Sequence, residues 1–214
     1  MQIRLKKNIP IAAGLAGGST DAAAALHGIN QWLKLGLSLH ELQEIGTAIG
    51  SDIPFCLQGG FCRVRGRGEQ IESIPAGQEI WMLIITPPLV VSTALIYRTF
   101  DCLPKAVHYS FCNEVAESLQ KGSNQRIPWV WGNDLERATF SLFPAVEKLK
   151  KNLAELPYIL GALMSGSGPT IICLVAGEKE GIYAEQKLRS LYPDYAIHLA
   201  KTIRPEFKLE FMEA

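Results

Sequence analysis

The chain has 214 residues, of which 48% are hydrophobic and 20% are charged. This length and composition are typical of a globular protein with one large or two small domains, and they exclude a disordered chain. Lysine plus arginine and aspartate plus glutamate number 21 each, so no overall basic field favours nucleic acid or an anionic membrane as the main partner. We expect a small polar ligand that is bound by local geometry.

The five cysteines are scattered, odd in number and without any CxxC spacing, which indicates neither a disulfide framework nor a zinc site. The first ten residues contain no apolar stretch of the kind found in signal peptides, and no segment approaches the roughly 20 apolar residues that a membrane span needs. These features predict a cytoplasmic protein.

Residues 2–6 alternate between polar and apolar, which predicts a half-buried strand that leads into a glycine-rich turn. From Ser19, apolar residues recur at helical spacing and Gly36 follows the last of them, which predicts a buried amphipathic helix. The sequence Ser38-Leu39-His40-Glu41 has the form of a capping box, so a second helix is expected from about residue 39 to 49, ending at Gly50. Asp52 lies just beyond that end.

Strands are predicted over 61–64 and 81–86, with a domain boundary near Ala76 or Gly77. Beyond Pro87 and Pro88 the patterns predict helices over 92–101, 113–121, 144–155 and 179–191, and strands over 170–175 and 196–202. Helices interleaved with strands indicate a layered α and β architecture.

The stretch PIAAGLAGGSTDAAAAL, residues 10–26, places three glycines directly before an alanine-rich helix. Glycines let backbone N–H groups approach a bulky anion, and the first turn of the helix adds unpaired N–H groups and the positive end of a dipole. This pattern predicts a phosphate cradle, in which Ser19 or Thr20 supplies a hydroxyl to phosphate or magnesium. It is neither a Walker sequence nor GxGxxG. The alternative is a tight turn that packs an alanine helix on a sheet.

Three further turns are candidates for a site: GSDIPF at 50–55, GRGE at 66–69 and SGSGP at 165–169. Each taken singly is more often a structural turn, and an aspartate after a helix commonly accepts backbone hydrogen bonds. Their combination favours a functional interpretation.

The successive motifs IPIAAGLAGGSTDAAAAL, IGSDIPFCLQGG, GRGEQIESIP, PPLVVSTALIY, NDLE and MSGSGPT resemble those of the 4-diphosphocytidyl-2-C-methyl-D-erythritol kinase family, within the GHMP kinase superfamily. The resemblance covers nearly all of the chain. It implies phosphorylation of a hydroxyl of the cytidyl substrate by ATP with Mg²⁺, in the non-mevalonate isoprenoid pathway. Nucleic acid and membrane are not expected partners.

The resemblance implies an α+β, two-domain fold. A partial ribosomal-protein-like α/β ATP-binding domain is expected over residues 1–76, and a ferredoxin-like domain over residues 77–214. It also implies roles for individual residues. Asp52 is the expected catalytic aspartate, as a base or as an orienting anion. The other positions divide into a nucleotide-binding set, Pro10, Ala13, Gly14, Leu15, Ala16, Gly17, Gly18, Ser19 and Thr20, and a substrate-binding set, Thr93, Tyr97, Ser165, Gly166 and Gly168.

Within these sets, the loop from Ser165 to Gly168 is expected to shape the phosphate loop from the other domain. Tyr97 has the alternative of being an ordinary buried tyrosine. Asn133 and Asp134 are interpreted as the start of a helix, because both residue types are common caps.

Two departures from the family pattern stand out. Ala16 replaces a glycine that is often found in the loop, which predicts a negative φ at this position. The family's amino-terminal segment, with a PAKINL-type strand that carries a catalytic lysine and a GYH-type turn that holds the cytosine, is not in the sequence. We expect either a truncated gene product or a start assigned too late; Lys6 and Lys7 do not replace that lysine.

Two alternatives therefore stay open. One is another GHMP kinase, acting on homoserine, mevalonate or a sugar. The other is a non-catalytic remnant that binds nucleotide or a partner.

Overall fold

The computed structural model describes residues 3–75, 79–104, 112–121 and 132–203. They form two compact units. The amino-terminal unit contains residues 3–7 and 16–75 with residue 203, and the carboxyl-terminal unit contains residues 8–15 and the described part of 79–202. The boundary expected near Ala76 or Gly77 lies outside the described residues.

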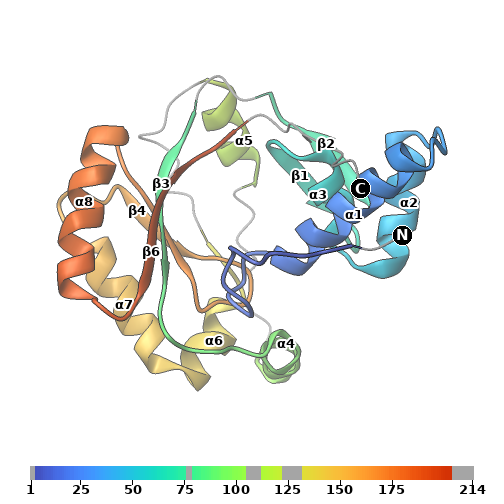
Figure 1. The fold of residues 1–214 in the computed structure, drawn as a ribbon. Helices are drawn as coiled ribbons and strands as arrows, with labels where there is room; N and C mark the ends of the chain where they lie inside the picture. Colours follow the sequence, from blue (N-terminus) through green and yellow to red (C-terminus); the bar gives the residue numbers. More distant parts are fainter. Residues whose placement is uncertain (1–2, 76–78, 105–111, 122–131, 204–214) are drawn as a thin grey trace. The chain divides into compact units, whose positions relative to one another are not determined.

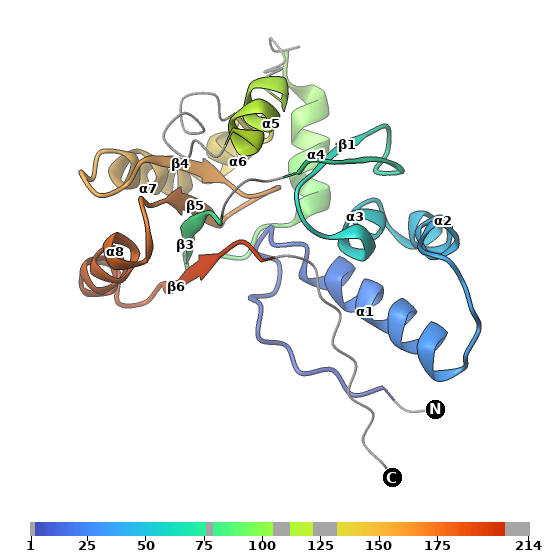
Figure 2. The same ribbon diagram turned by 90° about the horizontal axis from the view of Figure 1, so that it is seen from above.

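The amino-terminal unit consists of three helices and a hairpin (Figure 2). The helices are α1 (Gly17–Trp32), α2 (Leu39–Ile49) and α3 (Ile53–Gln58), and the antiparallel strands are β1 (Cys62–Arg65) and β2 (Gln70–Ser73). Their small core contains Ala23, Leu42, Ile53 and Leu57, so all three helices contribute to it. Helix α3 and strand β2 were not predicted from the sequence.

Helix α2 has the predicted bounds and the predicted capping box. The Glu41 N–H donates to the Ser38 hydroxyl at 3.3 Å, and the Ser38 N–H donates to the Glu41 carboxylate at 2.8 Å. Helix α1 ends slightly earlier than predicted. The first left-handed residue after it is Lys34, with φ 52°, and not the predicted Gly36. Its expected burial is also only partly right: Ala23 is fully buried, whereas Trp32 and Leu33 are each 51% exposed.

The strand predicted over residues 2–6 is wrong for the residues that the structure describes. Residues 3–8 are not paired with any described strand. Ile3 and Leu5 are 60% and 59% exposed. Alternation stabilises a strand only where one face can be buried against a core, and these two side chains are not buried.

The carboxyl-terminal unit is built on a four-stranded antiparallel sheet with the order β4-β5-β3-β6. Its strands are β3 (Trp81–Thr86), β4 (Gly161–Met164), β5 (Ile171–Leu174) and β6 (Ala196–Lys201). The helices α7 (Pro144–Ala154) and α8 (Glu178–Leu191) cover one face of this sheet (Figure 1). This βαββαβ arrangement confirms the ferredoxin-like expectation and the α+β class.

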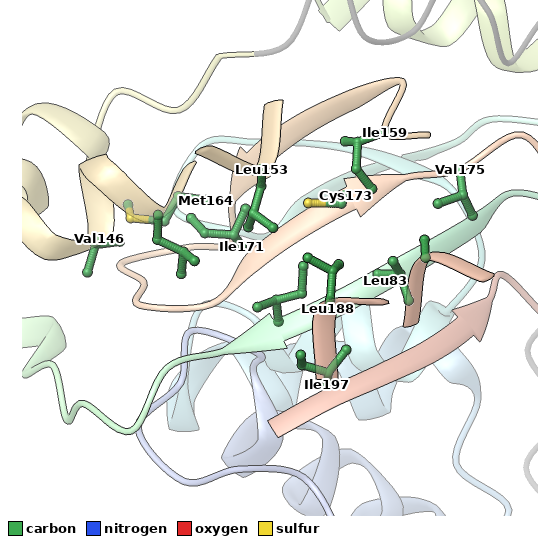
Figure 3. Packing of buried hydrophobic residues seen from close by; sticks show 13 residues of the cluster. Leu83, Val146, Leu153, Ile159, Met164, Ile171, Cys173, Val175, Leu188 and Ile197 are labelled. Atoms are coloured by element: carbon green, nitrogen blue, oxygen red, sulfur yellow. The ribbon is translucent and has the colours of Figure 1, made fainter. Parts of the chain in front are cut away.

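The main core fills the space between the sheet and these two helices (Figure 3). Leu83 and Ile85 from the central strand are fully buried, with Leu188 from α8 and Leu153 from α7. This burial explains the apolar residues Leu83 and Ile85, which alternate along β3 and lie in the core on the helix-covered face of the sheet.

A second apolar cluster joins α4 (Thr93–Cys102) to α6 (Glu136–Leu142) through Val91, Ile96 and Ala138. Helix α5 (Cys112–Gln120) completes the described elements. The helix start predicted at Asn133 and Asp134 corresponds to α6, whereas β4 was not predicted from the sequence. Among the described residues, no helix has both the length and the apolar character required to cross a membrane.

Candidate active site

The turn before α1 has an unusual backbone. Ala12, Gly14 and Ala16 have φ values of 53°, 73° and 48°, a region that costs an alanine about 1 to 2 kcal/mol. The negative φ predicted for Ala16 is therefore wrong. In this left-handed conformation Ala16 is the N-cap of α1, and its carbonyl accepts the Thr20 N–H at 2.9 Å and the Thr20 hydroxyl at 3.1 Å. Backbone strain of this kind is often found at functional sites.

The amino end of α1 has no capping side chain, because its N-cap is Ala16. Its N-cap makes no side-chain hydrogen bond, and its first turn contains no acidic residue. The first N–H groups of an α-helix have no acceptor within the helix, which here applies to Gly17, Gly18 and Ser19. A Cβ built on Gly18 would have no neighbour within 4 Å. Free donors at the positive end of a helix dipole favour an anion such as phosphate.

Gly14 lies against the loop of residues 165–168 within the carboxyl-terminal unit. A Cβ on Gly14 would be 2.3 Å from the Ser165 carbonyl oxygen and 2.9 Å from that of Gly168. The Ser165 hydroxyl donates to the Gly14 carbonyl at 2.8 Å. A side chain at position 14 would thus separate two backbone segments that are in contact. The loop does not reach Gly14 from another unit, because residues 8–15 and 165–168 belong to the same one.

The neighbouring predicted residues differ in exposure. Ala13 is 3% exposed, so its side chain is buried. Pro10 and Leu15 are half-buried. Gly166 has φ 52°, and a Cβ there would be 3.1 Å from the Gly14 carbonyl oxygen. The structure therefore brings Gly14, Ser165, Gly166 and Gly168 together in one unit.

Asp52 is exposed in the short turn between α2 and α3. It occupies the N-cap position of α3, yet its side chain makes no capping hydrogen bond. An N-cap aspartate normally accepts such a bond. The structure therefore does not show the alternative in which the Asp52 carboxylate caps the turn.

Cys56 lies near Asp52 and Thr20 in the same unit, with its Sγ 3.7 Å from the Thr20 hydroxyl. Burial raises the pKa of the Cys56 thiol; the Thr20 hydroxyl lowers that pKa and the negative charge of Asp52 raises it. A thiol with a raised pKa is neutral at physiological pH and is a poor nucleophile. Burial therefore disfavours Cys56 as a nucleophile.

The GRGE motif forms the turn of the β1–β2 hairpin. Gly66 and Gly68 have φ values of 69° and 119°. The Glu69 carboxylate accepts the Arg67 N–H at 2.7 Å, and hydrogen bonds from the backbone N–H groups of Glu69 and Arg67 lower the pKa of Glu69. The motif is therefore a structural turn, and it lies in the same unit as Asp52.

Thr93 and Tyr97 lie one turn apart on α4. The Thr93 hydroxyl is 3.0 Å from the Ser167 hydroxyl, which joins α4 to the loop of residues 165–168. Tyr97 is 52% exposed, so the alternative of an ordinary buried tyrosine is wrong. Both side chains are on the surface of the carboxyl-terminal unit.

Three residues around α6 hold the 165–168 loop, a role that was not predicted from the sequence. Asn133 Nδ2 donates to the carbonyls of Met164 and Gly166, both at 2.8 Å. The Thr139 hydroxyl donates to the Ser167 carbonyl at 3.1 Å, and the Glu136 carboxylate accepts the Met164 N–H at 3.1 Å. Asn133 also accepts the Leu135 N–H at 2.9 Å, as a residue at a helix start does. No sequence signal links residues about 30 positions apart.

Comparisons with known proteins agree with these features. Two family models match the chain: GHMP kinases N terminal domain over residues 1–60, and GHMP kinases C terminal over residues 111–194. Among curated proteins, the chain is 38% identical over 200 residues to the 4-diphosphocytidyl-2-C-methyl-D-erythritol kinase of Moorella thermoacetica, covering 91% of this chain and 68% of that protein. For the enzyme of the same name from Pelotomaculum thermopropionicum the identity is 39% over 206 residues, with 95% and 70% covered.

Solved structures match as well. A crystal structure of 4-(cytidine 5'-diphospho)-2C-methyl-D-erythritol kinase matches with a TM-score of 0.72 and 28% identity, covering 92% of this chain and 68% of that one. Homoserine kinase from Cytophaga hutchinsonii has a TM-score of 0.73 at 20% identity, with the same coverage. The second likeness shows only a shared fold.

The chain spans 60% of the length of the similar kinases from Enterococcus faecalis and Bacillus cytotoxicus, and 68% to 70% of the two described above. The two relatives described above, of whose length this chain covers more than two thirds, are 38% and 39% identical to it. With the fold and both family models in agreement, the chain belongs to the 4-diphosphocytidyl-2-C-methyl-D-erythritol kinase family of GHMP kinases.

Proposed function

We propose that the protein transfers the γ-phosphoryl group of ATP to a hydroxyl of 4-diphosphocytidyl-2-C-methyl-D-erythritol, in the non-mevalonate isoprenoid pathway. The names of the similar proteins support this substrate. The observation that carries the proposal is the amino end of α1, which has no side-chain cap and no acidic residue in its first turn. A triphosphate is the kind of ligand that such a helix end binds.

In this proposal the segment from Gly14 to Thr20 holds the ATP phosphates, with Pro10 and Ala13 in the turn before it. The residues fit a nucleotide, because Gly17, Gly18 and Ser19 offer backbone donors next to open space at Gly18. Mg²⁺ bound to the phosphates would neutralise charge on the transferred group. Ser19 or Thr20 would supply a hydroxyl to the phosphate or to the Mg²⁺.

Asp52 has the role of the catalytic carboxylate. Its side chain is exposed and makes no capping bond. It either accepts the proton of the attacking hydroxyl or orients that hydroxyl toward the γ-phosphorus, and in both cases it acts as an anion. The remaining proposed residues, Thr93, Tyr97, Ser165, Gly166 and Gly168, contact the cytidyl substrate or shape its pocket.

The proposal extends to the organisation of the chain. Residues 1–76 form the ATP-binding domain and residues 77–214 form the carboxyl-terminal domain, and the protein works in the cytoplasm, on a small-molecule substrate.

The test is an ATP turnover assay with three candidate acceptors, 4-diphosphocytidyl-2-C-methyl-D-erythritol, homoserine and mevalonate, together with a calorimetric titration of ATP. Turnover with the cytidyl substrate alone is expected. Turnover with homoserine or mevalonate would identify a different GHMP kinase. ATP binding without turnover on any acceptor would identify a non-catalytic nucleotide-binding protein.

Asp52→Asn tests the catalytic assignment, because the amide is nearly the same shape and lacks the charge. We expect turnover to fall by about 10²-fold or more, as is usual for the loss of an acid or base, with ATP affinity nearly unchanged. Turnover within about tenfold of the unmodified protein would remove Asp52 from the mechanism.

A further inference from the structure

Beside the hydrogen bonds from Asn133 and Thr139, an ion pair also anchors the backbone at the start of the 165–168 loop. Lys150, on α7, donates from Nζ to both carboxylate oxygens of Glu136, at 2.6 and 2.7 Å. The Glu136 oxygen at 2.6 Å also accepts the Met164 N–H, at 3.1 Å. One carboxylate therefore connects α7 to the end of β4.

This pair is shielded from solvent. The side chains of Lys150 and Glu136 are only 23% and 14% exposed, whereas those of Lys151 and Glu147, which form the neighbouring pair on α7, are 69% and 39% exposed. Charged hydrogen bonds are stronger when they are shielded from water, and removing one partner leaves the other charge poorly solvated. The shielded pair is thus suited to hold its neighbours in one place.

The backbone that Glu136 holds, at Met164, is next to the residue that contacts Gly14. Ser165 follows Met164, and its hydroxyl donates to the Gly14 carbonyl at 2.8 Å. The two backbones are in contact, because a Cβ on Gly14 would lie 2.3 Å from the Ser165 carbonyl oxygen. A shift of Met164 by a fraction of an ångström would therefore move Ser165 away from this hydrogen bond or into Gly14.

We infer that Glu136, held by Lys150, is a positioning residue: it keeps Ser165 on the Gly14 carbonyl and so sets the affinity of the glycine-rich turn for nucleotide. The second part rests on the proposed function, since it takes ATP as the ligand of the turn. Glu136 touches no substrate and acts through Met164, Ser165 and Gly14.

The experiment uses Lys150→Met, which removes the cation, and Lys150→Arg, which keeps it. Glu136→Gln is a second variant that breaks the ion pair but retains an oxygen for the Met164 N–H. Lys151→Met is the matched control, because it breaks the exposed pair on the same helix. Two readouts are taken on the full chain: the amide chemical shift of Leu15, whose nitrogen is bonded to the Gly14 carbonyl, and the dissociation constant of ATP.

We expect Lys150→Met and Glu136→Gln to move the Leu15 amide in the same direction as Ser165→Ala, which removes the hydrogen bond outright. ATP binding should weaken by about tenfold, the effect of losing one charge-assisted hydrogen bond. The ATP dissociation constant of Lys150→Arg should stay within about twofold of the unmodified protein, and Lys151→Met should change neither readout.

An unchanged chemical shift of the Leu15 amide in Lys150→Met and Glu136→Gln would overturn the inference. A changed chemical shift with unchanged ATP affinity would overturn it as well. If the unmodified chain binds no ATP, the proposed function fails, whereas the Leu15 shift still decides whether Glu136 positions Ser165 on Gly14. The two failures are therefore distinguishable.

Discussion

Gly68, in the turn of the β1–β2 hairpin, lies directly on the backbone of Ser51. A Cβ built on Gly68 would be 2.0 Å from the Ser51 carbonyl oxygen, and the φ of Gly68 is 119°. Ser51 precedes Asp52, so the hairpin turn supports the segment that carries the candidate catalytic carboxylate. This contact gives a physical reason for two motifs that are separated in sequence, GSD and GRGE, to occur together.

Gly68→Ala should therefore destabilise the amino-terminal unit and displace Asp52. A non-glycine residue at such a φ costs about 1 to 3 kcal/mol, and the clash with Ser51 adds to this cost. We expect a lower free energy of unfolding in urea and a shifted Asp52 amide signal in nuclear magnetic resonance spectra.

Gly36→Ala is the matched control for that substitution. Gly36 also has a positive φ, 68°, but a Cβ there would have no neighbour within 4 Å. It should show the conformational cost alone, about 1 to 2 kcal/mol, and no change at Asp52. An equal loss of stability in both variants would mean that the contact with Ser51 has no energetic consequence.

Gly18→Ala should separate stability from nucleotide binding. Gly18 lies in the first turn of α1 with open space around its Cβ position, and alanine is favoured over glycine in a helix by roughly 0.5 to 1 kcal/mol. The variant should be slightly more stable in urea. Its methyl group would project beside the free N–H groups, so ATP affinity measured by calorimetry should fall. Unchanged affinity would make Gly18 a helix residue only.

Glu41 should contribute to stability in a pH-dependent way. The backbone N–H of Ser38 and then its hydroxyl lower the pKa of Glu41 in the folded protein. The stabilisation is thus present above the pKa of an unfolded glutamate and is lost as pH falls through the lower, folded value. The difference in unfolding free energy between the unmodified chain and Glu41→Gln should be largest at neutral pH and shrink in acid.

Glu44→Gln provides the control for Glu41. Glu44 is exposed, one turn beyond His40 on α2, and its carboxylate lies 3.8 Å from the His40 ring rather than in the capping box. Its substitution should have a small effect in unfolding titrations. If Glu41→Gln lowered the unfolding free energy equally at neutral and acidic pH, the lowered pKa of Glu41 would not be the source of its stabilisation.

Thr93→Ala should reduce the affinity for the cytidyl substrate more than the affinity for ATP. The substitution removes the hydroxyl 3.0 Å from Ser167, at a position where the family is expected to contact the substrate. A lost hydrogen bond of this kind is worth about 0.5 to 1.5 kcal/mol, so KM should rise severalfold. Thr93→Ser keeps the hydroxyl and should preserve KM. Equal KM values for the alanine and serine variants would exclude this role.

Local patterns in the sequence predicted the longer elements well. The capping box at Ser38 and the glycine at position 50 gave both ends of α2, and the apolar run of residues 81–86 predicted the bounds of β3. Helices α7 and α8 lie within about two residues of their predicted ranges. These signals succeed because caps, helical periodicity and apolar runs act between residues close in the chain.

Short elements were missed because their stability comes from distant partners. The four residues of β4 carry little intrinsic preference and are a strand because they pair with β5. The six residues of α3 are held by the core that Ile53 and Leu57 form with Ala23 and Leu42. A helix this short is not stable by its own propensity.

The conformation of Ala16 and the anchoring of the 165–168 loop were decided by tertiary structure. A left-handed alanine is intrinsically unfavourable, so local preference predicts the opposite sign of φ; here the Ala16 carbonyl accepts two hydrogen bonds from Thr20. Glu136 and Met164 are 28 positions apart and meet only because α6 packs beside the end of β4. The sequence thus contained the turns, the helix start and the carboxylate of the candidate site, whereas packing between distant segments determined which of these residues touch.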